Sequence, residues 1–162
     1  MANLDLGVVE TFTTGTIGPK GQRVFFLQAN SSGSTFSLRL EKEQVRAMAE
    51  HLANLLSDLP EINANEWTSA PQLIEPVEPI WTIGAMGAMY DSIEDQIVIM
   101  AEEVSEDPDT ENAATATLRL GRGQTAAFIE RANEVVEAGR PPCPFCARPL
   151  NYGEDGFCPC WN

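Results

Sequence analysis

The feature that most constrains the fold of this chain is an internal repeat of a strand followed by a helix. Thr35-Phe36-Ser37-Leu38-Arg39-Leu40 leads into Glu41-Lys42-Glu43-Gln44-Val45-Arg46-Ala47-Met48, and eighty residues later Thr115-Ala116-Thr117-Leu118-Arg119-Leu120 leads into Gly121-Arg122-Gly123-Gln124-Thr125-Ala126-Ala127-Phe128. Alternation places the two leucines of each first run on one face of a strand. Apolar residues spaced three and four apart then continue each second run as an amphipathic helix.

Further strands are predicted before each of these runs. Segments rich in β-branched and aromatic residues alternate with segments rich in Gly, Pro, Asn and Ser, which are typical of turns. The expected strands span residues 12–18, 24–29 and 35–40 in the first copy and residues 79–89, 97–104 and 115–120 in the second. The repeated unit is therefore β-β-β-α.

The predicted fold class is α+β. One copy is too small to bury both its sheet and its helix well, so we expect the copies to pack about a pseudo-twofold axis, with an antiparallel sheet and two helices sharing one core. This duplicated α+β domain would span residues 1–138, with repeat 1 at about 10–57, a connector at 58–78 and repeat 2 at about 79–138. Residues 139–162 would form a separate tail.

The tail contains all four cysteines of the chain, in the runs Cys143-Pro144-Phe145-Cys146 and Phe157-Cys158-Pro159-Cys160. Two close thiolate pairs joined by a short loop can surround Zn²⁺ tetrahedrally at about 2.3 Å from each sulfur. We therefore predict a small zinc knuckle whose metal ligands are Cys143, Cys146, Cys158 and Cys160.

Zinc in this tail would be structural, because four sulfur ligands close its coordination shell. Metal binding, on the order of 10 kcal/mol in small zinc peptides, would supply the folding energy of the tail. Iron, disulfides and redox chemistry remain as alternatives. Disulfides need an oxidising compartment, whereas the opening Met1-Ala2-Asn3-Leu4-Asp5 has no basic or apolar export segment, so a cytoplasmic location is expected. A redox dithiol would leave Cys158 and Cys160 without a role.

The net charge of -14 is concentrated in the middle of the chain. Residues 61–112 hold thirteen Asp or Glu and no Lys or Arg, whereas the flanking parts are nearly neutral. Nucleic-acid binding is not expected, because a duplex binder needs several cations and the tail offers only Arg140 and Arg148. Membrane insertion is not expected either, since no apolar run approaches the ~20 residues that span a bilayer. The acidic block indicates solvated loops or a docking surface for a basic partner.

A set of short motifs is spread over nearly the full length of the chain. They are Gly15-Thr16-Ile17-Gly18, Gly21, Arg23, Phe25-Phe26-Leu27-Gln28-Ala29, Leu40-Glu41-Lys42 with Gln44, and above all Ala138-Gly139-Arg140-Pro141-Pro142-Cys143-Pro144-Phe145-Cys146 with Pro149-Leu150. In these motifs the chain resembles a bacterial family of conserved proteins of unknown function that is typical of actinobacteria.

The resemblance implies a tail with three Cys ligands and one His ligand, because the family tail usually ends in a His-x-Cys-Pro-Arg pattern. Here Gly156 stands at the histidine position and Cys160 at the arginine position. The fourth ligand is thus expected to have moved from before Cys158 to after it. Members of the family are often encoded beside a histidine-phosphatase-like protein and a protein similar to phosphatidylinositol 3/4-kinases. This association suggests a kinase-like or phosphatase-like enzyme as a protein partner.

The turn Gly121-Arg122-Gly123, with Thr125 after it, is a candidate phosphate cradle, because backbone N–H groups and an arginine can bind an anion at a helix start. An ordinary strand-to-helix turn is the favoured interpretation. The first copy carries Glu41 and Glu43 at the equivalent place, and these would repel an anion.

A second candidate site is a cleft between the two copies, where Arg39, Arg119, Gln44 and Gln124 could converge on a ligand. Strand alternation equally explains the two arginines as exposed sheet positions. The solitary His51 is expected to be a boundary residue on the flank of the first helix, since no nucleophile can be paired with it.

No catalytic constellation is found, so no catalytic residue is assigned and an enzyme is not favoured. The leading hypothesis is a zinc-binding, non-catalytic protein-interaction or adaptor protein linked to a phosphoryl-transfer pathway. The first alternative is a small-molecule or phosphate binder, or an enzyme, that uses the cleft between the repeats. The second is a nucleic-acid-associated regulator, which the charge opposes.

Overall fold

The computed structural model describes residues 3–19, 21–62, 66, 68–106 and 113–138. The fold of this part is α+β, as predicted. Its strands are β1 (Asn3–Val8), β2 (Thr11–Ile17), β3 (Val24–Ser31), β4 (Ser34–Leu40), β5 (Pro79–Asp91), β6 (Gln96–Glu103) and β7 (Thr115–Leu120), and its helices are α1 (Lys42–Ser57) and α2 (Arg122–Glu137). None of the helices in the described ranges is long and apolar enough to cross a membrane.

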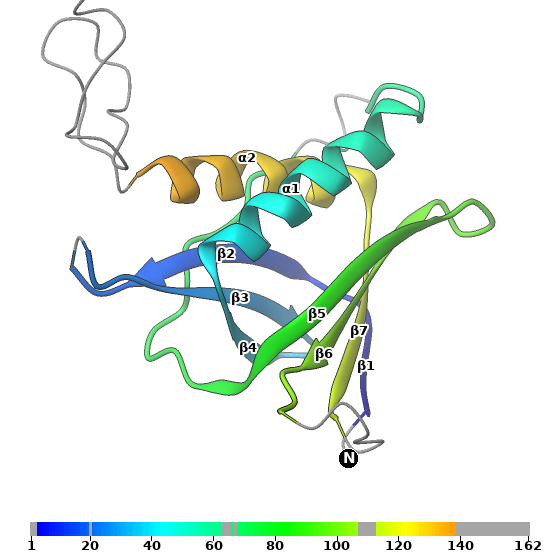
Figure 1. Ribbon diagram of the computed structural model, residues 1–162. Helices are drawn as coiled ribbons and strands as arrows, with labels where there is room; N and C mark the ends of the chain where they lie inside the picture. The colour runs from blue at the N-terminus through cyan, green and yellow to red at the C-terminus, as the bar shows by residue number, and fades with distance from the viewer. Residues whose placement is uncertain (1–2, 20, 63–65, 67, 107–112, 139–162) are drawn as a thin grey trace, which may run out of the picture.

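One sheet takes the seven strands in the order β1-β7-β6-β5-β4-β3-β2. Its two outer strands, β1 and β2, are consecutive in the chain, with Val9 and Glu10 between them. The Val9 N–H donates to the Arg119 carbonyl at 3.1 Å, and the Glu10 N–H donates to the Asn30 carbonyl at 2.8 Å. The two ends of the strand order, β1 and β2, are thus joined directly by the bend at Val9 and Glu10. The sheet curves round an apolar interior (Figure 1).

The sheet is mixed, which corrects the prediction of an antiparallel sheet. The hairpin neighbours are antiparallel, but β4 pairs with β5 and β7 pairs with β1 in parallel. After β4, the chain passes through α1 and the connector and enters β5 in the same direction as β4. A crossover through a helix joins parallel strands in this way. The pattern of short hairpins within each half did not reveal this junction.

Both helices lie side by side across one side of the sheet (Figure 1). Each buries an apolar stripe, which includes Val45 and Leu52 in α1 and Phe128 in α2. The ring of Phe128 packs against that of Phe12 in β2, with centroids 4.5 Å apart. Burying a side chain of this kind stabilises a fold by roughly 1.5–3 kcal/mol. The core therefore joins elements from both halves of the chain.

A glutamine in the first turn of α1 ties the helix to the long strand β5. The Gln44 Oε1 atom accepts a hydrogen bond from the Glu41 N–H at 2.7 Å, which satisfies a donor at the helix start. Its Nε2 atom donates to the carbonyls of Ile83 and Gly84, each at 3.2 Å. These carbonyls lie where β5 stops pairing with β4 and continues along β6.

The corresponding glutamine of α2 makes the same set of contacts. The Gln124 Oε1 atom accepts from the Gly121 N–H at 2.9 Å. Its Nε2 atom donates to the carbonyls of Val9 at 3.0 Å and Glu10 at 3.2 Å, at the bend between β1 and β2. Each helix start therefore holds the bend of a strand from the other half of the chain.

Candidate protein-interaction site

The outward side of the sheet has two parts with the same register. In β2, β3 and β4 the outward residues form what we call the covered face, and those of β5, β6 and β7 form the open face. The covered face comprises Thr13, Gly15, Phe26, Gln28, Ser37 and Arg39, and the open face comprises Gly87, Met89, Val98, Met100, Thr117 and Arg119. Thr13, Gln28 and Ser37 stand in one row of the covered face, as Gly87, Met100 and Thr117 do on the open face.

A segment of the connector, residues 71–74, lies on the covered face, and we call it the strap (Figure 1, green segment before β5). The Thr13 hydroxyl donates to the Pro71 carbonyl at 2.5 Å. The Gln28 amide donates to the Ile74 carbonyl at 3.1 Å and accepts from the Ile74 N–H at 2.7 Å. Thr13 and Gln28 are buried under the strap, so their polar groups need these partners.

Gly15 makes room for the strap. A Cβ atom added at Gly15 would lie 2.7 Å from the Leu73 Cγ atom, which is too close for a real contact. The leucine side chain thus occupies the space that a side chain in β2 would fill. The strap, which belongs to a connector expected only to link the two halves, is therefore packed against the sheet.

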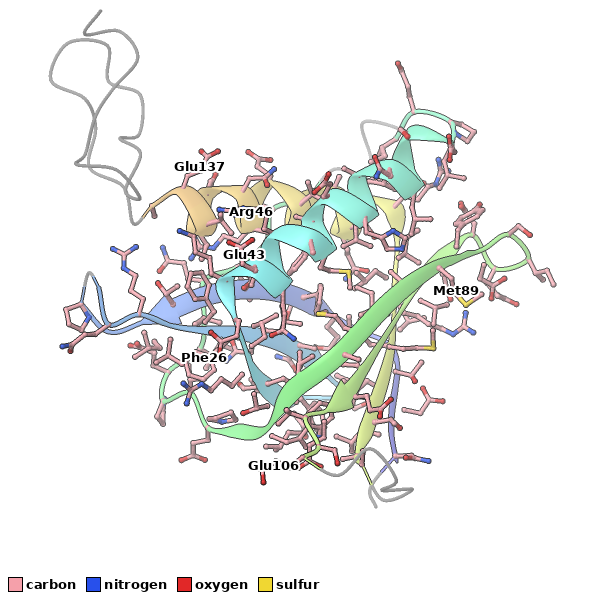
Figure 2. All side chains as sticks on the ribbon, in the orientation of Figure 1. Phe26, Glu43, Arg46, Met89, Glu106 and Glu137 are labelled. Atoms are coloured by element: carbon pink, nitrogen blue, oxygen red, sulfur yellow. The ribbon has the colours of Figure 1, made fainter. Side chains whose placement is uncertain are left out.

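On the open face no described segment takes the place of the strap. A Cβ atom added at Gly87 would meet nothing within 4 Å. The neighbouring methionines are accessible, with Met89 52% and Met100 44% exposed. A shallow depression of about 360 Å³ runs over this region and is lined by residues of β5, β6 and β7. Figure 2 shows Met89 beside the β5–β6 hairpin, on the side away from the helices.

Carboxylates border the open face. The one cation of the face, Arg119, forms an ion pair with Asp91 at 2.9 Å and also donates to Gln96. This guanidinium holds the pKa of the Asp91 carboxyl below its usual value. Asp5 in β1 and Glu102 in β6 are exposed, and within the described ranges no cation lies at ion-pair distance from either of them. The border of the face is therefore electronegative.

The candidate phosphate cradle at the start of α2 is occupied by the chain itself. The Arg122 guanidinium forms an ion pair with Asp95 at 3.1 Å and donates to the Pro60 carbonyl at 2.8 Å. A Cβ atom added at Gly123 would collide with the Glu66 carbonyl, so this glycine serves close backbone packing. The structure supports the interpretation as an ordinary turn.

The four residues expected to converge in a cleft between the copies are not brought together. Gln44 and Gln124 each bind backbone carbonyls at a different strand bend. Arg119 is paired with Asp91 on the open face, whereas Arg39 is exposed on the covered face. These contacts give no support to the cleft.

His51 has a structural contact that the sequence analysis did not identify. Its Nε2 atom lies 2.9 Å from the Ala88 carbonyl of β5. In α2, Arg131 stands at the corresponding position and its Nε atom donates to the Thr14 carbonyl of β2 at 3.2 Å. Both side chains thus attach a helix to a strand of the other half, β5 for His51 and β2 for Arg131, which accounts for His51 without a catalytic role.

The predicted zinc ligands Cys143, Cys146, Cys158 and Cys160 lie outside the described residues. Within residues 3–138, apart from the gaps given above, no group of three His, Cys, Asp or Glu side chains could hold a metal ion. The candidate site of the described part is therefore the open face, with its accessible methionines and its border of carboxylates.

Comparison with known proteins gives a family and no function. No curated protein and no solved structure matches the chain. A family model described as a protein of unknown function, DUF3090, matches residues 5–158, which is nearly the full length. The chain therefore belongs to the DUF3090 family of proteins of unknown function.

Proposed function

We propose that this chain is a non-catalytic protein-interaction or adaptor protein that binds its partner on the open face. One observation carries the proposal: the chain covers one of two matching sheet faces with its own strap, whereas no described segment covers the other, where Val98 is buried but Met89 and Met100 are accessible. An apolar surface bordered by polar groups is typical of a protein-binding site. Methionines suit such a site because their side chains adapt to different partners.

The two faces are proposed to descend from a duplicated β-β-β-α unit packed about a pseudo-twofold axis. The equal register of the two halves supports this proposal, as does the equal use of Gln44 and Gln124. A register shift next to Ser37 in the β4–β5 pair also corresponds to one opposite Thr117 in the β1–β7 pair. A duplication explains why one fold has two faces of the same geometry.

The tail is proposed to bind structural zinc through Cys143, Cys146, Cys158 and Cys160. The spacing of the cysteines supports this assignment. In this proposal the adaptor is cytoplasmic, and a kinase-like or phosphatase-like enzyme is the first partner to test. That partner class rests only on the resemblance and on its gene neighbourhood.

Quantitative affinity purification from the cells that express the protein tests this function. The tagged full chain would be compared with Gly87→Leu, which fills the open face, and with Cys143→Ser, which removes one predicted zinc ligand. Ala47→Leu is the matched control, because it adds the same side chain at an exposed position of α1. We expect a stoichiometric partner that is lost with Gly87→Leu and kept with Ala47→Leu. No such partner, or one unaffected by Gly87→Leu, would contradict an interaction role for this face.

A further inference from the structure

The strap shows how this fold holds an additional chain segment. Residues 71–74 lie against the sheet through the Leu73 side chain over Gly15 and through backbone contacts at Pro71 and Ile74. The open face repeats the register of the covered face. A segment that is seated on the corresponding strands would therefore lie across β5 and β6, next to β7.

The side chains of the open face define what such a segment must carry. The glycine of the open face is Gly87, which lies in the row that corresponds to that of Thr13 on the covered face. The space above Gly87 is empty in the described part of the chain. Met100 replaces the amide of Gln28 beside it. One large apolar side chain fits here, whereas a polar anchor equivalent to Gln28 is missing.

The charges beside this position define the flanks of the segment. Asp5 shares a row with Gly87 and Met100, and Glu102 stands two residues beyond Met100 on the same side of β6. Successive residues of a strand rise by about 3.3 Å each, so Glu102, two residues from Met100, is about 7 Å from the row. Lys or Arg side chains near the apolar anchor can reach both carboxylates.

Resting on the proposed interaction role, we infer that the open face binds an extended segment of a partner protein with one large apolar side chain flanked by Lys or Arg. The apolar side chain is seated over Gly87 beside Met100. The flanking cations pair with Asp5 and Glu102. The acidic surface steers the segment to the face, so binding weakens as salt rises.

A peptide titration tests this inference on the full chain. The probe is a fluorescent peptide with a central leucine and lysines at alternating flanking positions, and binding is followed by anisotropy. Two control peptides carry alanine in place of the leucine or glutamate in place of the lysines. The alanine peptide is needed because a protein with a net charge of -14 attracts any basic peptide.

We expect saturable binding that Gly87→Leu weakens at least about tenfold and that Ala47→Leu leaves unchanged. Glu102→Lys should weaken binding about three- to tenfold and flatten its salt dependence, with Glu50→Lys on α1 as the charge-matched control. Methyl NMR should show the signals of Met89 and Met100 moving while that of the buried Met48 stays.

Several outcomes would overturn the inference. They are absence of saturation, equal binding of the alanine or glutamate peptide, and equal binding by Gly87→Leu. Contacts of the Met100 methyl group with residues 139–162 in the free chain would also overturn it, because the occupant would then be the chain's own tail. If the peptide fails while a cellular partner still depends on Gly87, only the inferred partner chemistry is wrong. If both fail, the proposed function fails as well.

Discussion

The covered face and the open face have the same strand register, but the strap lies on the first and no described segment lies on the second. On the covered face, Gly15 admits Leu73, and Gln28 pairs with the backbone of Ile74. On the open face, no described residue covers Gly87, and Met100 stands where Gln28 would be. A few side chains therefore decide whether the connector of the chain packs on a sheet face.

The two halves differ far less on the inner side. Gln44 and Gln124 bind the bends of two strands in the same way, and His51 and Arg131 attach the helices at corresponding positions. These contacts cross from one half to the other. The inner side therefore maintains the fold, and the outer side is where the two halves differ.

The largest expected effect comes from the core that both halves share. Phe128→Ala leaves a cavity against Phe12, and we expect it to lower the free energy of unfolding by about 3–5 kcal/mol. Because the helices bind across the halves, the described domain should still unfold in one transition. Urea denaturation followed by circular dichroism and by tryptophan fluorescence checks this. Two separate transitions would show that the halves are independent.

The second prediction tests the equivalence of the two helix starts. Gln44→Ala and Gln124→Ala each remove three hydrogen bonds and leave strand carbonyls without these donors. We expect each variant to lose about 2–3 kcal/mol of stability in chemical denaturation. Gln22→Ala at an exposed turn is the control and should change little. Strongly unequal losses would weaken the comparison of the halves.

The third prediction is that a glycine-to-alanine substitution changes the stability in opposite directions on the two faces. Gly15→Ala would force Leu73 and the strap away, at a cost of about 1–3 kcal/mol. Gly87→Ala meets no atom and should stabilise the chain by about 0.4–1 kcal/mol, because it restricts the unfolded state. Thermal unfolding of the two variants measures both effects. A loss of stability at both positions would show that the open face is already filled.

The smallest expected effect concerns the ion pair on the open face. The pKa of Asp91 is lowered, first by its hydrogen bond from Arg119, so this pair stabilises the fold at neutral pH. The contribution is lost as the pH falls below about 3.9 and then through the lower pKa of the folded state. Arg119→Met should raise the pKa of Asp91 in an NMR titration of the carboxyl carbon. An unchanged pKa would mean that Arg119 does not hold Asp91.

Sequence periodicity predicted the elements of the fold well. The expected strand at residues 24–29 is β3 (Val24–Ser31), and the repeated helices begin one residue after Glu41 and Gly121. Local patterns did not predict β1 or the parallel strand pairs, because these depend on pairing between strands that are far apart in the sequence. The order and direction of the strands in the sheet therefore became known only from the structure.

The open face was not predicted from sequence. Alternation places Thr13 and Gln28 on outward positions, but it does not tell that the connector covers them. The eighty-residue spacing that relates Gln44 to Gln124 also relates His51 to Arg131, so the role of His51 could have been inferred. The exposed Met89 and Met100 became informative only when the strap was seen on the other half.

Methionine footprinting with hydrogen peroxide, followed by mass spectrometry, tests the central claim most directly. The purified full chain would be compared with the same chain in an extract of its own cells at native abundance. Exposed Met89 and Met100 should oxidise rapidly in the purified chain and slowly in the extract, while Met48, 4% exposed, stays protected in both. Equal oxidation of Met89 and Met100 in both samples, or protection already in the purified chain, would contradict a face kept open for a partner.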